Sequence, residues 1–282
     1  MALTLTLADS LLLTTDTLQA GVIETLATES KILAELPFMN IEGSGYSYNV
    51  ETELSDVKFR KVGDPIIPGK PEFKNAVAAL KILGDEAMVD TFQVAVHSNV
   101  NDLMAIEVML KSKAIAHKFE KTFLTGDETV NIDEFNGIEK LLIPSQKAEA
   151  TDVIADDVDY LLDLIQGEAS ALIMNKATRR QFVAQNRSYI TYTNNKFGAK
   201  LAVYGDTPIL DVDTEVLAKD GEIYAVKFGP KEAVCGLQNG GVRTTFLGEV
   251  DDAPQIKTRI EWFVGLAVFN DKTIAKREVK AP

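Results

Sequence analysis

The sequence predicts an α+β fold in which one long helix lies against long antiparallel strands. Three observations lead to this prediction. Residues 94–126 form one continuous helical pattern, residues 43–84 and 241–282 read as long strands, and residues 141–240 mix short helices with short strands. An amphipathic helix and a sheet each bury one face, so the two are expected to cover each other.

The composition is that of an ordinary globular protein. The chain has 282 residues, 46% of them hydrophobic and 25% charged, which is enough for a substantial core. The formal net charge of −13 excludes a protein whose whole surface attracts nucleic acid, because such binding needs a positive field. No apolar run reaches the roughly 20 residues that span a bilayer, and the start lacks the basic segment of a secretory signal. We therefore expect a protein that is made in the cytoplasm and has no membrane partner.

Residues 1–42 are expected to form an N-terminal arm. The first 13 residues alternate Thr, Leu and Ala in short apolar runs without turn signals, which is typical of an extended segment. Residues 17–33 then predict a helix with Val22, Leu26 and Leu33 on its apolar side, ended by Pro37. Two interpretations remain open: the helix docks on its own domain, or the segment crosses to a neighbouring subunit.

Residues 43–84 are expected to form an extended hairpin rather than a domain. Tyr46, Tyr48 and Val50 alternate with polar residues, and residues 73–83 form a second strand-like run. The segment between them is polar and rich in Pro and Gly, so it cannot build a core, and loops of this length are usually functional. We expect its tip to contact a neighbouring subunit through Lys58, Phe59, Arg60, Lys61, Pro65 and Pro68. A mobile surface loop is the alternative.

Residues 85–140 contain the predicted long helix at 94–126, with Gly126 as the residue that ends it. Its apolar side chains form two faces. The main face carries Met104, Val108, Ile115, Phe119 and Phe123, and the adjoining face carries Leu103, Ile106 and Leu110. Glu107 stands one turn before Lys111, which predicts an ion pair along the helix surface.

Residues 141–240 predict a mixed α/β region, and residues 241–282 predict a return to long strands. Helices are expected at 156–166 and 176–185, the second capped by Asn175. Short strands are expected at 171–174, 201–204, 208–212, 223–228 and 233–237, and later strands at 242–247, 256–263, 265–269 and 273–279. The later strands are expected to support the long helix, with Trp262 in the core between them.

Several short motifs follow one another in a set order. They are Val77-Ala-Ala-Leu-Lys-Ile-Leu83 running into Asp85-Glu-Ala-Met-Val-Asp90, then Phe123-Leu-Thr-Gly-Asp127, Phe135-Asn-Gly-Ile138, Ala171-Leu-Ile-Met-Asn175 with Ala177-Thr178, and Tyr204-Gly-Asp-Thr-Pro-Ile-Leu210. Together with the arm and the projecting loop, this order resembles the major capsid proteins of tailed bacteriophages, whose shell fold is shared with encapsulin compartments. The resemblance covers almost the whole chain, and the order of the motifs carries it.

The resemblance implies a tailed-phage major capsid fold. Its parts would be an N-terminal arm at 1–42, an extended loop at 43–84, a peripheral domain with the long spine helix at 85–140, a mixed α/β axial domain at 141–240, and peripheral return strands at 241–282. It also implies a structural protein, without enzyme activity or cofactor, that self-assembles into hexamers and pentamers of an icosahedral head around double-stranded DNA. The implied partners are further copies of the chain, a separate scaffold protein and a portal protein. Assembly would take place in the host cytoplasm, and the final location would be the virion capsid.

Two other function classes remain as alternatives: an encapsulin-like shell around a protein cargo, and an α/β enzyme with an unrecognised acidic site. The sequence offers little for catalysis, because His97 and His117 are the only histidines and lie too far apart along the helix to act together. Neither of the two common glycine-rich nucleotide-binding motifs is present. Cys235, the only cysteine, is expected to be buried. The adjacent acids Asp156–Asp157 and Asp251–Asp252 could bind a cation, but they are expected to be solvated in turns and helix starts.

The resemblance also raises covalent cross-linking, since some members of the family join subunits through a loop lysine and an asparagine, assisted by a glutamate. Lys58 and Lys61 lie in the corresponding loop, and Asn270 and Glu278 lie in the return strands. These residues do not align to the family's triad, so no cross-link is expected. A denaturing gel of purified shells tests this, because an uncross-linked shell gives only a monomer band.

Overall fold

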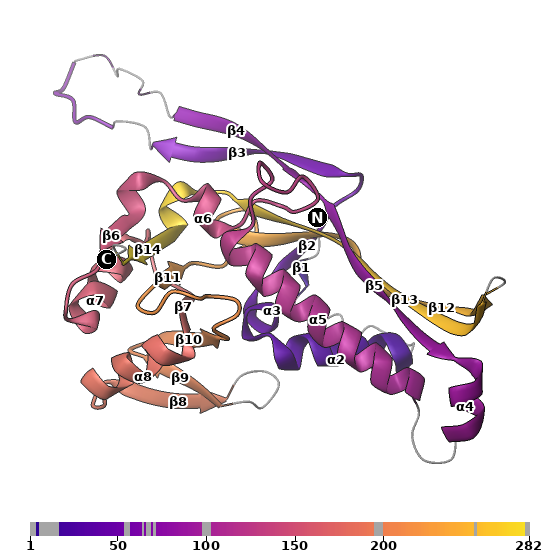
Figure 1. The fold of residues 1–282 in the computed structure, drawn as a ribbon. Coiled ribbons are helices and arrows are strands. Elements are labelled where there is room, and N and C mark those ends of the chain that lie inside the picture. The colour runs from indigo at the N-terminus through magenta and orange to yellow at the C-terminus, as the bar shows by residue number, and fades with distance from the viewer. Residues whose placement is uncertain are drawn as a thin grey trace.

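The computed structural model describes residues 4–5, 17–53, 57–63, 65, 69, 72–97, 103–194, 200–250 and 253–279 (Figure 1). The helices are α2 Thr17–Glu29, α3 Lys31–Glu35, α4 Thr91–His97, α5 Leu103–Thr125, α6 Ile138–Leu141, α7 Ile154–Leu164 and α8 Lys176–Gln185, with short 3-10 helices at Pro144–Gln146 and Asp271–Thr273. The strands are β1 Thr4–Leu5, β2 Phe38–Asn40, β3 Gly45–Glu53, β4 Glu72–Ala79, β5 Lys81–Asp90, β6 Lys147–Glu149, β7 Ala171–Asn175, β8 Ile190–Asn194, β9 Lys200–Tyr204, β10 Thr207–Val212, β11 Ile223–Val226, β12 Val234–Val250, β13 Ala253–Val268 and β14 Ile274–Glu278. The α+β class is therefore confirmed.

A five-stranded sheet in the order β1-β2-β12-β13-β5 supports the long helix. Its centre is the antiparallel pair of β12 and β13, which are 17 and 16 residues long. The sequence predicted two shorter strands within each of them. In the structure, the two segments predicted within β12 are one continuous strand, and so are the two predicted within β13. The gap expected in β12 is the place where its pairing with β13 shifts register, between Gln238 and Val242. Figure 1 shows α5 and α2 side by side along this sheet.

The long helix is shorter than predicted. The described residues of 94–126 belong to two helices, α4 and α5, which run in different directions in Figure 1, so the expectation of one continuous helix is wrong. Residues 98–102, which include the expected start of the helix, lie outside the described residues. The predicted ion pair within the helix is also wrong, because Lys111 lies 2.9 Å from Asp85 of β5 rather than pairing with Glu107.

The main apolar face of α5 is buried as predicted, and Trp262 of β13 lies at its centre. Trp262 is fully buried, with its ring 5.2 Å from the rings of both Phe119 of α5 and Phe38 of β2. Its indole N–H donates to the side-chain oxygen of Gln238 at 3.2 Å, so the buried polar atom has a partner. One aromatic cluster thus ties the helix, the central strand and the N-terminal strand together.

The helix predicted at 17–33 is broken at Ser30 into α2 and α3. The Ser30 hydroxyl accepts a hydrogen bond from the backbone N–H of Leu33, so it caps α3, and the chain leaves helical geometry before Pro37. Val22, Leu26 and Leu33 are buried in the same core cluster as the aromatic residues of α5. For residues 17–35 the segment therefore docks on its own body, and the interpretation that it crosses to a neighbour is wrong. The remaining residues of 1–16, apart from Thr4–Leu5, lie outside the described residues.

A second sheet of seven strands forms the mixed α/β region, in the order β6-β14-β11-β7-β10-β9-β8. Alternate residues of its central strand β7 face opposite cores: Leu172 and Met174 contact the cluster of α7 and α8, whereas Ala171 and Ile173 contact the cluster of the long helix. Asn175 caps α8 as predicted, by accepting from the backbone N–H of Thr178 at 2.7 Å. The strand predicted at 273–279 forms, but as β14 it joins this sheet rather than the strands that support the helix.

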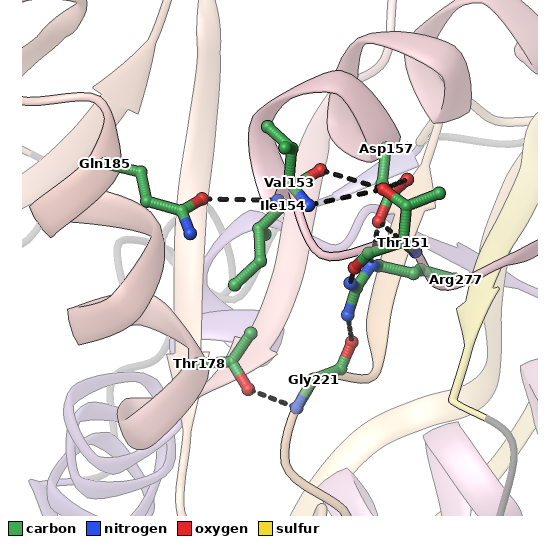
Figure 2. A network of polar contacts seen from close by, with 8 residues as sticks. All are labelled: Thr151, Val153, Ile154, Asp157, Thr178, Gln185, Gly221 and Arg277. Atoms are coloured by element: carbon green, nitrogen blue, oxygen red, sulfur yellow. Dashed lines mark hydrogen bonds and ion pairs between the residues drawn. The ribbon is translucent and has the colours of Figure 1, made fainter.

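Asp157 is not a solvated residue of a helix start, as the sequence suggested, but a buried partner of Arg277. Figure 2 shows the network: Arg277 Nε donates to Asp157 at 2.6 Å, and the same carboxylate accepts from the backbone N–H and the hydroxyl of Thr151. Burial alone would raise the pKa of Asp157, but the hydrogen bonds from Thr151 and Arg277 outweigh it and leave the pKa below its usual value. Asp251 and Asp252, the other adjacent acidic pair, lie outside the described residues.

Two glycines allow the chain to turn tightly after α5. The N–H of Gly137 donates to the carbonyl of Gly126 at 2.9 Å, which brings the two motifs of this turn together. A Cβ at Gly126 would lie 2.4 Å from the carbonyl oxygen of Phe135 and 2.5 Å from that of Thr122, closer than van der Waals contact allows. The turn therefore requires glycine at this position.

Gly126→Ala is expected to lower the free energy of unfolding by about 1–3 kcal/mol, because the backbone must move to admit the methyl group. The matched control is Gly21→Ala in α2, where a Cβ meets nothing within 4 Å and alanine favours the helix by about 1 kcal/mol. Urea denaturation followed by the fluorescence of Trp262 measures both variants. Equal changes in the two would show that the turn does not need glycine.

Candidate inter-subunit surface

The hairpin of β3 and β4 has an inner face that packs on its own body. Tyr48 is 8% exposed, its ring lies 4.8 Å from the ring of Phe269, and its oxygen accepts from the backbone N–H of Val268 at 3.3 Å. Burial raises the pKa of Tyr48, which keeps it a neutral phenol. Together with Val50 and Ala78 it belongs to a third apolar cluster beneath the hairpin. The base of the hairpin is thus fixed by the chain itself. The predicted pairing of two strands is confirmed. Residues 81–84, which were expected in the hairpin, instead belong to β5 and pair with β13.

The outer face and the tip of the hairpin are exposed. Phe73 and Val77, which alternate with inward residues of β4, are 61% and 72% exposed. In the tip, Phe59 and Val62 are 108% and 104% exposed, so no described residue covers them. Large apolar side chains exposed along one projecting segment favour an interaction site there.

The predicted contact residues fall together in this tip. Lys58, Phe59, Arg60, Lys61 and Pro65 are all exposed, and Pro68 lies outside the described residues. Figure 1 shows the hairpin projecting away from both sheets, with this segment at its far end. The far end of the hairpin therefore presents basic side chains beside apolar ones.

A further exposed apolar strip continues from the hairpin along β5 into α4. Sequence reasoning missed it, although the alternation of β5 was a usable signal: Ile82 and Met88 point away from the core and are 73% and 47% exposed. Phe92 and Val96 of α4 extend the strip and are 73% and 56% exposed.

Charged groups lie between these apolar residues on the same face. Glu86 of β5 lies 2.8 Å from Arg259 and 3.4 Å from Lys257, and the hydrogen bond from Arg259 holds the pKa of Glu86 below its usual value. Ile82, Glu86, Met88, Arg259 and Glu261 line a shallow depression of about 380 Å³ at this place. A depression with apolar rims and paired charges suits a protein partner better than a small substrate.

The adjoining apolar face of α5 is only partly buried by the rest of the chain. Ile106, Met109 and Leu110 are 38%, 43% and 51% exposed, in the half of the helix that follows α4. The apolar stripe of the helix is therefore wider than the surface that its own sheet covers.

Metal-binding and nucleophilic side chains among the described residues bear on the alternative of an enzyme. Among them, no group of three or more His, Cys, Asp or Glu side chains is placed to hold a metal ion. Cys235 is buried as predicted, and burial raises the pKa of its thiol to about 12, which leaves it unreactive. None of the described helices is both long and apolar enough to cross a membrane.

The residues considered for a cross-link have other partners within the chain. The amide nitrogen of Asn270 donates to Gln166 at 2.9 Å, and its oxygen accepts from the backbone N–H of Lys272 at 2.8 Å. The carboxylate of Glu278 lies 3.7 Å from the amine of Lys147. The structure thus gives Asn270 a local capping role.

Comparison of the whole fold with solved structures finds shell proteins. An encapsulin from Synechococcus elongatus PCC 7942, solved as the holo-SrpI encapsulin complex, aligns with a TM-score of 0.66 at 16% identity over 88% of this chain and 86% of its own. The capsid of a native GTA particle aligns with a TM-score of 0.66 at 13% identity over 91% of each chain. A structure from Microbacterium phage Oxtober96 aligns with a TM-score of 0.65 at 13% identity over 89% of this chain and 91% of its own.

The sequence itself matches one family model, which describes the major capsid protein GP7. The match covers residues 14–158, just over half of the chain, and includes α2, the hairpin, α5 and the turn after it. Among proteins with curated functions, none matches the sequence. The chain therefore belongs to the family of the major capsid protein GP7, and it is a structural subunit of a capsid shell.

Proposed function

We propose that the chain assembles into hexamers and pentamers of an icosahedral phage head that encloses double-stranded DNA. The observation that carries the proposal is the hairpin. Its base is fixed in the chain's own core, and its tip holds apolar side chains that the described part of the chain leaves exposed. A neighbouring copy that covers this tip would bury those side chains. Repeated around a closed symmetric shell, one such contact is satisfied in every subunit.

We propose that the tip contacts the neighbouring copy through Lys58, Phe59, Arg60, Lys61, Pro65 and Pro68. The net charge of −13 supports an inner wall that encloses DNA without gripping it, since a negative surface repels phosphates. A separate scaffold protein would set the size of the shell during assembly in the host cytoplasm, and a portal protein would occupy one vertex. Both belong to the proposal as partners.

Removing residues 55–71 tests the proposal. The shortened chain is expected to stay soluble and folded, because the aromatic core and the base of the hairpin lie outside the deleted segment. It is expected to form no closed shells under conditions in which the full chain does. Sedimentation and electron microscopy measure assembly, and circular dichroism measures folding. Closed shells of normal size from the shortened chain would contradict the proposal.

A variant with three substitutions makes the same test without changing the length of the chain. Val57→Ser, Phe59→Ser and Val62→Ser together remove the apolar side chains of the tip, and we expect the same loss of assembly. The matched control is Val130→Ser with Ile132→Ser, which removes exposed apolar side chains from the turn after α5 and should leave assembly intact. A loss of shells in both variants would point to general surface polarity rather than to the tip.

An encapsulin-like shell around a protein cargo is the second candidate, and the similarity to the holo-SrpI encapsulin complex favours it. The two candidates differ in what the particle contains. Nuclease treatment followed by extraction is expected to recover double-stranded DNA from the interior of particles taken from infected cells. A single co-purifying enzyme in place of DNA would decide for the encapsulin-like shell.

A further inference from the structure

Glu120 of α5 is a buried carboxylate that forms no ion pair with a cation of the described residues. Its side chain is 4% exposed and lies where α5 meets the break between α2 and α3. Its one hydrogen bond in the described part of the chain comes from the hydroxyl of Ser30, at 2.7 Å. Ser30 is itself fully buried and caps α3. This hydrogen bond therefore joins the long helix to the start of α3.

The lysines around this contact form ion pairs with other carboxylates. The titratable groups that act on the Glu120 carboxyl are His117 on the same helix, Asp213 after β10 and Lys176 on α8. Lys176 forms an ion pair with Asp213 rather than with Glu120. On α2 and α3, which pack on α5, the charged groups are Glu24, Glu29, Lys31 and Glu35. Glu29 pairs with Lys113 at 2.6 Å, and Lys31 pairs with Asp211. Asp211 also lies 2.9 Å from Arg179 of α8.

We propose that the carboxyl of Glu120, buried where α5 meets Ser30, is a proton-operated latch that holds α3 and the end of α2 on the long helix. When Glu120 carries a proton, it is neutral, keeps its hydrogen bond to Ser30 and suits its apolar surroundings. When it loses the proton, a charge without a counter-ion is left in the core, which favours the opening that lets water reach it. The N-terminal segment is thereby held more firmly at low pH than at high pH.

The direction follows from the environment of the carboxyl. Burial is the largest cause and raises the pKa of Glu120 from 4.5 to about 7, while the Ser30 hydroxyl opposes this. Once the segment opens, the carboxyl meets water and returns towards its ordinary value. Below about pH 4.5 the carboxyl is neutral in both states, and opening is least favourable. Between about pH 4.5 and pH 7 the equilibrium constant for opening rises by about tenfold per pH unit. Above about pH 7 this group causes little further change.

Hydrogen exchange of the full-length chain, measured by mass spectrometry from pH 5 to 8, tests the latch. Rates must be divided by the intrinsic exchange rate at each pH. In the natural sequence, protection of the α3 amides is expected to fall by about 40-fold between pH 5 and pH 7 and by only about twofold more from pH 7 to pH 8. In Glu120→Gln, which stays neutral at every pH, protection is expected to be independent of pH in this range.

Three further variants separate the latch from other titrations. Ser30→Ala removes the hydrogen bond that favours the charged carboxyl, so the pH at which protection levels off should move upwards even though α3 loses its cap. His117→Gln should keep the natural pH dependence, although histidines ordinarily change charge in this range. Glu134→Gln should also keep it, because the hydrogen bond from Lys118 holds the pKa of Glu134 below its usual value.

A pH-independent protection of α3 in the natural sequence would overturn the latch, and so would a pH dependence that survives in Glu120→Gln. Loss of the dependence in His117→Gln alone would assign it to the histidine and would also overturn the proposal. None of these outcomes depends on shell formation, so the latch and the proposed assembly fail separately.

Discussion

Replacing Arg277 with methionine is expected to lower the free energy of unfolding by about 3–5 kcal/mol, one of the two largest effects of a single substitution in this chain. Arg277 is 4% exposed and donates to Asp157, to the carbonyl of Gly221 and to the carbonyl of Thr151, each at 2.6 Å (Figure 2). Methionine fills much of the same volume but leaves Asp157 buried without a counter-ion and two carbonyls without a donor. Breaking a buried pair from one side carries this full cost.

The matched control is Arg259→Met, which removes an arginine from the exposed ion pair with Glu86 on β5. Arg259 is 43% exposed at its side chain, so water replaces the lost contact and the expected change is below about 1 kcal/mol. Urea denaturation of the two variants, followed by the fluorescence of the single tryptophan, measures the difference. Equal destabilisation would show that the network of Arg277 is no more costly to break than a surface pair.

Replacing Trp262 with alanine is expected to lower the free energy of unfolding by about 3–5 kcal/mol, with the shell lost along with the fold at moderate temperature. The indole contacts both Phe38 and Phe119, so its removal opens a cavity between the N-terminal strand and the long helix. It also leaves the buried side chain of Gln238 without its donor. Circular dichroism in urea measures the change, because the variant has no tryptophan.

Trp262→Phe is the informative companion. It keeps most of the ring contacts but removes the N–H. We therefore expect it to lower the free energy of unfolding by less than Trp262→Ala does. If phenylalanine were as destabilising as alanine, the hydrogen bond to Gln238 rather than the aromatic packing would hold this part of the core.

The elements that depend on nearby residues could be predicted from the sequence. The spacing of Val108, Ile115 and Phe119 gave the buried face of the long helix, because side chains three or four positions apart share one side. Asn175 was identified as a cap from its place before a helical run. The hairpin followed from alternation on both sides of a segment that cannot form a core.

The features that depend on distant residues could not be predicted in this way. Alternation marks Ile274–Glu278 as a strand but does not say which sheet it joins, and β14 pairs with β11 rather than beside the long helix. Adjacent acids look solvated until Arg277, 120 positions further along the chain, is placed beside Asp157. The break at Ser30 was hidden because the apolar periodicity continues from α2 into α3 on both sides of it.

Only the hairpin tip of the candidate inter-subunit surface was predicted, and the reason is physical. A basic and Pro-rich segment can be recognised as one that will not bury itself, which placed Lys58 and Arg60 in the expected surface. The apolar strip on β5 and α4 has the same pattern as a buried face, and only the fold shows that the chain leaves Ile82, Phe92 and Val96 uncovered.

Cryo-electron microscopy of particles formed by the purified full-length chain tests the central claim most directly. The account predicts closed shells in which the hairpin tip of each copy lies on an adjacent copy, with Val57, Phe59 and Val62 buried in that contact. Protein that stays monomeric at every concentration would contradict it, and so would a closed shell in which those three side chains remain in solvent.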